Sequence, residues 1–140
     1  MTWLVETDVI LAAINSRDPM HGEARSLISR LTELYLSPYT LIEIDLLIRS
    51  GILRVSNVEK FWQKLAQALR YHEIEVMPPK PEHHREAHRL REERGLTYFD
   101  SLHAAAAIVG GLTLVSYDEK AYRGVPGLRY RHPAEVGIGP

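Results

Sequence analysis

Cysteine is absent from this sequence of 140 residues. Disulfide bonds, thiolate metal sites and a cysteine nucleophile are therefore excluded, and the composition suits a reducing compartment. The sequence also lacks an excess of basic residues, because 17 Lys and Arg stand against 18 Asp and Glu, for a formal net charge of −1. A nucleic-acid partner would therefore meet local clusters of Lys and Arg rather than a positive field over the whole surface.

Long apolar runs are also absent. No segment approaches the ~20 consecutive apolar residues that a membrane-spanning helix needs, and the first residues resemble no secretory signal. We therefore expect a cytoplasmic protein with no membrane association. The length suits one domain with its own core. We assign residues 1–135 to this domain and expect residues 136–140, which end in GIGP, to form a frayed tail.

Short apolar stretches alternate with segments of helical periodicity along the chain. The patterns predict strands at 3–6, 35–37, 73–77, 112–116 and near 128–131, and helices at 9–15, 20–33, 37–51, 56–71, 81–95 and 99–111. Such alternation predicts an α/β fold, in which a parallel sheet carries helices on both faces. Sheets of this kind place their ligands at the carboxyl ends of the strands.

Acidic residues follow the predicted strands or open the predicted helices. Glu6 and Asp8 follow the first strand, and Asp118 follows the strand LTLVS. Glu43 lies in the apolar stretch LIEIDLLI, where a buried carboxylate needs a partner, and Asp100 opens an alanine-rich helix. Several carboxylates without His or Cys ligands favour the hard cations Mg²⁺ and Mn²⁺. Such a site suits phosphoryl transfer or phosphodiester hydrolysis by a metal-activated water.

Each acid taken alone also has a structural explanation. Asp8 fits the N-cap of the helix at 9–15, and Asp100 would stabilise any first helical turn through the helix dipole. Asp118 fits the cap of a short helix at 119–122. Their joint placement at one edge of the sheet is what favours a metal site.

The ordered set of motifs resembles the PIN domain family and, within it, the VapC-type toxins, which are Mg²⁺- or Mn²⁺-dependent ribonucleases. The segments LVETDVIL, SPYTLIEIDLL, YFDSLHAAAA and SYD match the acidic elements of that family in order and spacing, over most of the chain. The resemblance implies a PIN-like α/β/α sandwich with a central, mainly parallel sheet of four or five strands. It implies a catalytic, metal-binding cluster of Glu6, Asp8, Glu43, Asp100 and Asp118, supported by the hydroxyl of Ser116.

The opening motif departs from the family pattern. The usual first Asp aligns with Glu6, and Asp8 aligns with the usual Asn or Ser. Two arrangements are open: Glu6 reaches the metal with its additional methylene group, or Asp8 takes over that role. Because side chains alternate along a strand, residues 6 and 8 would share one side if the extended geometry persists.

Histidines and basic residues supply further candidates. His103, one helical turn after Asp100, is a candidate to orient a carboxylate or contact substrate, and we expect it in the core or in a supporting position. The segment HREAH at 84–88 lacks the Glu of the zinc motif H-E-x-x-H, which disfavours a zinc site. The run from Glu82 to Arg94 mixes charges of both signs, and we interpret it as a solvated helix face. The candidate RNA-contacting residues are Arg49, Arg54, Lys60, Lys64, Arg123 and Arg129.

The resemblance also implies partners: an RNA substrate, a cognate antitoxin protein and a second copy of the chain in a homodimer. Apolar residues are numerous for one small core, and exposed ones would mark a dimer or antitoxin surface. The residues concerned are Leu46, Leu47, Phe61, Trp62 and Leu65.

Two other functions stay open. One is a non-catalytic PIN-like module that binds RNA or protein, which the departure at Glu6 favours. The other is a HAD-like phosphatase, since those enzymes also begin with a strand followed by an acid-x-Asp motif. A HAD-like enzyme needs Asp as its nucleophile at the position of Glu6, and it needs a later Lys with paired Asp residues, a motif that we do not find.

Overall fold

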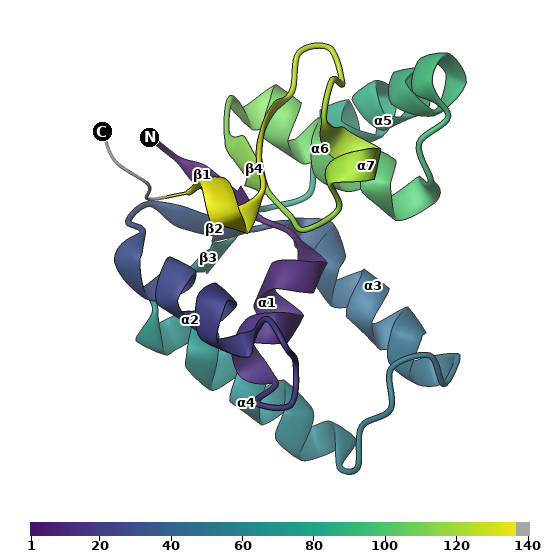
Figure 1. Ribbon diagram of the computed structural model, residues 1–140. Helices are drawn as coiled ribbons and strands as arrows, with labels where there is room; N and C mark the ends of the chain where they lie inside the picture. Colours follow the sequence, from purple (N-terminus) through teal and green to yellow (C-terminus); the bar gives the residue numbers. More distant parts are fainter. Residues whose placement is uncertain (137–140) are drawn as a thin grey trace.

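The computed structural model describes residues 1–136 and has a five-stranded parallel sheet at its centre (Figure 1). The strands are β1 (Trp3–Val5), β2 (Leu34–Leu36), β3 (Glu75–Val76), β4 (Thr113–Val115) and β5 (Arg129–Arg131), in the order β3-β2-β1-β4-β5. Every pairing in this sheet is parallel. The predicted fold class, an α/β sandwich around a mainly parallel sheet, is confirmed.

Helices cover both faces of the sheet (Figure 1). One face carries α1 (Thr7–Ile14), α2 (His21–Arg30) and α4 (Val58–Tyr71). The other face carries α5 (Pro81–Arg94), α6 (Tyr98–Gly110) and α7 (Glu119–Tyr122). Helix α3 (Pro38–Arg49) begins directly after β2, and α3 and α4 then extend away from the sheet, with residues 50–57 joining their far ends. A 3-10 helix, Pro133–Glu135, follows β5.

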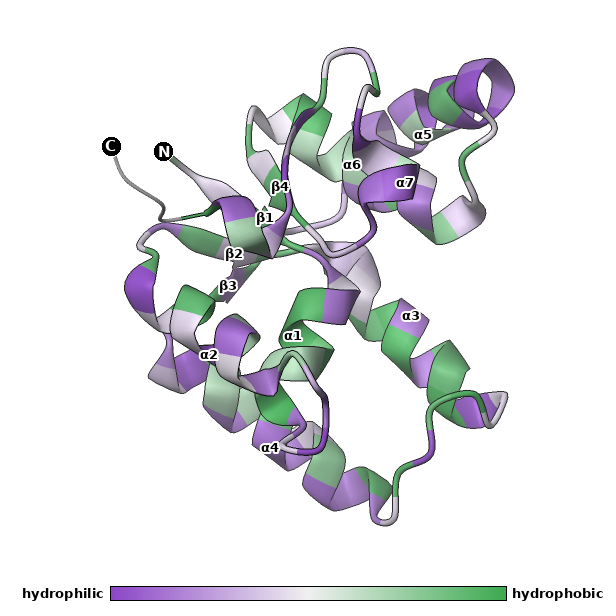
Figure 2. Cartoon of the chain, in the orientation of Figure 1, coloured by the Kyte–Doolittle hydropathy of each residue, from purple (hydrophilic) through white to green (hydrophobic). Residues whose placement is uncertain are grey.

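Two apolar cores lie on the two faces of the sheet. Strand β1 contributes to both, because Val5 packs with α1, α2 and α4, whereas Leu4 points to α5 and α6. The alanines at 104–107 are completely buried, so the small side chains let α6 pack closely against its neighbours. In Figure 2 the outer surface of α5 is strongly hydrophilic, whereas α1 is largely hydrophobic.

The first helix begins earlier than the sequence predicts. It starts at Thr7, so Asp8 lies inside its first turn, and the N-cap position belongs to Glu6. The interpretation of Asp8 as the helix cap is therefore wrong. The reason is that the Glu6 N–H still bonds to Val115 O at 3.1 Å, while its carbonyl already accepts from Val9 N.

The carboxyl ends of three neighbouring strands form the edge where the acids gather. Val5 pairs with both Leu36 and Val115 in the sheet register, so β1, β2 and β4 end at the same level. Residues 6–8, 37–43 and 116–118 therefore leave the sheet side by side, as parallel strands require. Helix α6 reaches the same edge from the other layer.

The predicted tail at 136–140 lies outside the described residues except for Val136, which is buried in the core. Within residues 1–136, no helix combines the length and the apolar character that crossing a membrane requires.

Candidate metal centre

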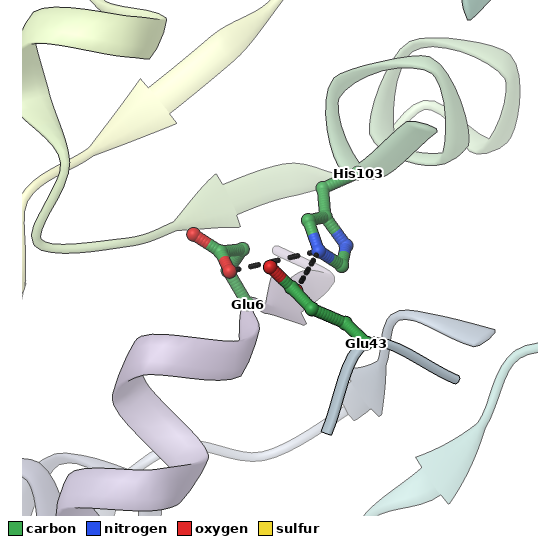
Figure 3. Close-up of side chains that lie close together, drawn as sticks. All are labelled: Glu6, Glu43 and His103. Atoms are coloured by element: carbon green, nitrogen blue, oxygen red, sulfur yellow. Dashed lines mark hydrogen bonds and ion pairs between the residues drawn. The ribbon is translucent and has the colours of Figure 1, made fainter. Parts of the chain in front are cut away.

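Three side chains from separate elements meet at this edge of the sheet (Figure 3). Glu6 follows β1, Glu43 comes from α3 and His103 comes from α6. The Nε2 atom of His103 lies 2.8 Å from Glu43 Oε1 and 3.6 Å from Glu6 Oε1. One ligand atom from each residue lies within 4.8 Å of the other two, so the three side chains can hold one metal ion.

The group is held in place by buried hydroxyls. The Thr7 hydroxyl donates to Glu43 Oε1 at 2.6 Å, and Ser37 Oγ lies 2.7 Å from His103 Nδ1. Ser37 is also the N-cap of α3, where its side chain accepts from the Tyr39 N–H. The serine that caps this helix therefore also orients the imidazole ring.

Electrostatics favour a cation among these carboxylates. Burial raises the pKa of Glu6 above its ordinary range, and the charges of Glu43 and Asp100 add to this effect. For Glu43, burial is outweighed by the hydrogen bonds from His103 and Thr7, so its pKa is lowered. Burial alone would lower the pKa of His103, but the hydrogen bond to Glu43 and the charges of both glutamates raise it. Buried negative charge therefore exceeds what the neighbouring donors neutralise.

Asp8 points to the loop after β4 instead of into the group. Its Oδ2 accepts from the Ser116 hydroxyl and from the Tyr117 N–H, both at 2.9 Å. Burial, followed by the charge of Glu6, raises the pKa of Asp8 to about 7. Among the described side chains, Asp8 Oδ1 is one of two buried polar atoms without a hydrogen-bond partner.

Ser116 connects the two N-terminal acids. Its hydroxyl oxygen lies 2.9 Å from Glu6 Oε2 as well as 2.9 Å from Asp8 Oδ2. A hydroxyl carries one proton, so it can donate to only one of these carboxylates at a time. The shortage of donors, together with the unpartnered oxygen of Asp8, fits a region that takes a cation.

Asp100 lies beside the group and contacts it through Tyr122. The Tyr122 hydroxyl donates to Asp100 Oδ1 at 3.2 Å and lies 3.4 Å from Glu6 Oε2. Burial and the adjacent carboxylates raise the pKa of Tyr122, so it stays a neutral donor at ordinary pH. Sequence reasoning missed Tyr122. The only sequence feature that pointed to this residue was its position four residues after Asp118.

Asp118 lies on the exposed side. Its Oδ1 accepts from the Ala121 N–H at 3.1 Å, so Asp118 is the N-cap of α7. Asp118 and Asp100 both line a surface hollow of about 300 Å³, together with Arg94 and Lys120. We call this feature the Asp100–Asp118 hollow. The acids of the expected cluster thus occupy three places: the buried group, the loop after β4 and the hollow.

The basic residues expected to contact RNA do not line the Asp100–Asp118 hollow. Arg54 and Lys64 border a depression at the other end of α1, and Arg123 and Arg129 border one beside β5. The cations at the hollow are Arg94 and Lys120 instead. Each lies near one of the acids in sequence, since Arg94 is six residues before Asp100 and Lys120 is two residues after Asp118, but the fold is what brings the two segments together.

The histidines of α5 have a structural role. His83 is buried, and its Nδ1 lies 2.8 Å from the Tyr39 hydroxyl of α3. The interpretation of this segment as a uniformly solvated face is therefore wrong at His83. His84 contacts the Tyr39 ring edge-on, and within residues 1–136 the histidines of α5 belong to no group of three potential metal ligands.

Comparison with protein families matches residues 3–125 to the model described as the PIN domain. Comparison with curated proteins gives no match. The fold is similar to that of VapBC2 from Rickettsia felis, which was solved with a DNA fragment from its promoter. The TM-score is 0.71 and the sequence identity is 23%, and the match covers 94% of this chain and 98% of that chain.

Two further solved structures share the fold. A toxin-antitoxin complex from Klebsiella pneumoniae has a TM-score of 0.70 and 19% identity, covering 96% of this chain and 100% of that chain. VapC20 from Mycobacterium tuberculosis, described as a toxin that cleaves the sarcin-ricin loop, has a TM-score of 0.62 and 19% identity, covering 88% of this chain and 91% of that chain.

Proposed function

Because the chain belongs to the PIN domain family, whose model matches residues 3–125, we propose that it is a metal-dependent endoribonuclease of the VapC toxin type. The observation that carries this proposal is the convergence of Glu6, Glu43 and His103 at the carboxyl edge of the sheet, with Asp100 beside them. The similarity in fold to a VapC toxin described as cleaving the sarcin-ricin loop supports RNA as the substrate.

We assign the metal site to Glu6 and Glu43, with Asp100 contributing from α6. These residues would hold a divalent ion, Mg²⁺ or Mn²⁺, which would supply a bound water of lowered pKa and positive charge to stabilise the phosphate. Of the two N-terminal arrangements, we favour Glu6 as the ligand, because Asp8 turns away to Ser116 and the backbone of residue 117.

The neighbouring side chains fix the carboxylates in position. The Thr7 hydroxyl holds one oxygen of Glu43, and the hydroxyls of Ser116 and Tyr122 lie against one oxygen of Glu6. Each carboxylate keeps its other oxygen free of these contacts. Side chains restrained in this way lose little freedom when substrate binds, which is what precise positioning of a phosphodiester requires.

The Asp100–Asp118 hollow gives RNA its approach to the acids. Arg94 and Lys120 line it and supply positive charge for the phosphates on either side of the cleaved bond. Tyr98, at the start of α6, leaves 56% of its surface exposed and has Arg91 over one face of its ring. Thr97, the residue before Tyr98, lines the hollow, and an exposed aromatic ring next to it in the chain suits the stacking of an unpaired base.

We assign the protein partner to the outer surface of α3. The expectation of surplus apolar residues is met in part: Leu65 is buried, Phe61 and Trp62 are half-buried against the core, and Leu46 is 51% exposed. Ile42, one turn before Leu46 on α3, is exposed as well. The Klebsiella pneumoniae neighbour is a toxin-antitoxin complex, which supports a cognate antitoxin here. The homodimer stays a prediction.

A cleavage assay with a matched pair of variants tests the function. Glu43→Gln keeps the size of the side chain and removes its charge, whereas Asp45→Asn makes the corresponding change at an exposed position of the same helix. We expect wild type and Asp45→Asn to cut a labelled RNA stem-loop with Mn²⁺ or Mg²⁺, and Glu43→Gln to be inactive. Equal cleavage by all three proteins would show that the acids of the metal site take no part in the reaction.

A non-catalytic PIN-like module is the second candidate, and the departure at Glu6 favours it. It predicts RNA binding in a filter or fluorescence assay without any cleavage by either ion. The HAD-like phosphatase loses its support, because the family match accounts for the acid-x-Asp motif at residues 6–8.

A further inference from the structure

His103 lies among the carboxylates of the metal site rather than behind them. Within residues 1–136, one group of three or more potential ligands converges closely enough to hold an ion, and it consists of Glu6, Glu43 and His103. The sequence alone suggested an all-oxygen site. The structure places an imidazole nitrogen at the centre of the group, with both glutamates as its neighbours (Figure 3).

The donor separations suit a shared ion. Around an ion with ligands at ~2.1–2.2 Å, neighbouring donor atoms lie about 3.0 Å apart at right angles and about 3.5 Å apart at tetrahedral angles. His103 Nε2 is 2.8 Å from Glu43 Oε1 and 3.6 Å from Glu6 Oε1. These two separations therefore suit a shared ion, and one ligand atom from each of the three residues lies within 4.8 Å of the other two.

The ring of His103 is held in the orientation that a ligand needs. The ring is completely buried, and its Nδ1 lies 2.7 Å from Ser37 Oγ. The Phe99 ring lies nearby at a small angle to it, with 6.4 Å between the two ring centroids. Metal-binding histidines commonly use their second nitrogen in such a hydrogen bond, which fixes the tautomer. When Nδ1–H donates to Ser37 Oγ, the lone pair of Nε2 faces the two carboxylates.

We propose that His103 binds the metal ion through Nε2 and makes the site selective for Mn²⁺ over Mg²⁺. Imidazole is a good ligand for first-row transition ions, whereas Mg²⁺ prefers oxygen ligands and retains its waters. This inference rests on the metal site of the proposed function but not on RNA as the substrate. In the competing explanation, His103 is a positioning residue: its Nε2–H donates to Glu43, and the ring does not contact the ion.

Electron spin echo spectroscopy of the Mn²⁺-loaded protein separates these roles. A directly bound imidazole gives ¹⁴N modulation in the echo decay, and labelling histidine with ¹⁵N replaces this pattern. We expect the modulation in wild type and in His88→Gln, a control at an exposed histidine of α5, and its loss in His103→Gln. Wild-type protein that binds Mn²⁺ without nitrogen modulation would overturn the proposal.

Calorimetric titration of both ions supplies the second measurement. We expect His103→Gln to weaken Mn²⁺ binding by about 10–100-fold, with a much smaller change for Mg²⁺. A circular dichroism melt identifies any loss of folding in this variant. His103→Asn, whose shorter side chain also ends in an amide that can donate and accept hydrogen bonds, provides a second comparison. An unchanged ratio of the two affinities in both variants would refute the proposed selectivity.

The outcomes for this inference and for the proposed function are distinct. Nitrogen coordination without RNA cleavage would support the inference and contradict the ribonuclease. Cleavage of RNA by a Mn²⁺ site without nitrogen coordination would support the ribonuclease and contradict the inference about His103. Absence of any binding of Mn²⁺ or Mg²⁺ would contradict both metal assignments.

Discussion

The buried carboxyl of Asp8 should make the metal-free protein less stable as the pH rises. Burial and the charge of Glu6 raise its pKa from the ordinary value of 3.8 to about 7. Between these values the unfolded chain has released the proton and the folded chain still holds it, so the free energy of unfolding falls with increasing pH. At ~1.4 kcal/mol per pH unit, the total loss from this one group is about 4 kcal/mol.

Asp8→Asn removes this titration. The amide oxygen can still accept from the Ser116 hydroxyl and from the backbone N–H of residue 117, so the local geometry is kept. Urea unfolding of chelator-treated protein, measured in steps from pH 4 to 8, gives the free energy directly. We expect the wild-type curve to fall by about 4 kcal/mol more than the Asp8→Asn curve.

Other groups near Asp8 also titrate, and the comparison must separate them. The raised pKa of His103 adds stability below its unfolded-state value of 6.5, and this stability is lost as the pH rises through the folded-state value. Because His103 is present in both proteins, the difference between the curves reports mainly on Asp8. Asp45→Asn, on the exposed side of α3, should run parallel to wild type. Parallel curves for Asp8→Asn and wild type would refute the account of Asp8.

Three further predictions follow from single contacts. Ser116→Ala should lower the free energy of unfolding by about 2–3 kcal/mol, because two carboxylates lose a shared donor, and Ser116→Thr should lose less in the same denaturation assay. The double variant Arg94→Ala/Lys120→Ala should raise the KM for RNA and make that KM less dependent on salt concentration, without weakening Mn²⁺ binding. The control Arg129→Ala, at a residue outside the hollow, should leave the KM unchanged. Tyr39→Phe should lose about 1–3 kcal/mol of stability by leaving a buried imidazole nitrogen unpaired, with no effect on metal affinity in calorimetry.

The sequence predicted the edge of the sheet where the acids gather. Apolar stretches at β1 and β4, each followed by polar residues, are local signals, and parallel strands carry their following residues to one edge. Glu43 was identifiable because a carboxylate in an apolar helix needs a partner. The cap role of Asp118 was also predicted, since it depends on neighbouring residues alone.

The partners of these acids were not predictable in the same way. Tyr122 and Glu6 are separated by 116 residues, and His103 and Ser37 by 66, so no periodicity connects them. The direction of Asp8 was missed for another reason. Helix α1 starts two residues earlier than the apolar pattern indicates, and this turns the side chain toward the loop after β4.

The central claim is that one divalent ion, bound by the acids at the edge of the sheet, is required for cleavage of RNA. The most direct measurement titrates Mn²⁺ into chelator-treated protein while bound ion and the rate of RNA cleavage are followed in the same samples. The account predicts that the rate rises in proportion to the occupancy of a single site, and that Glu43→Gln loses both. Cleavage without any ion, or a saturated site with no cleavage, would contradict it.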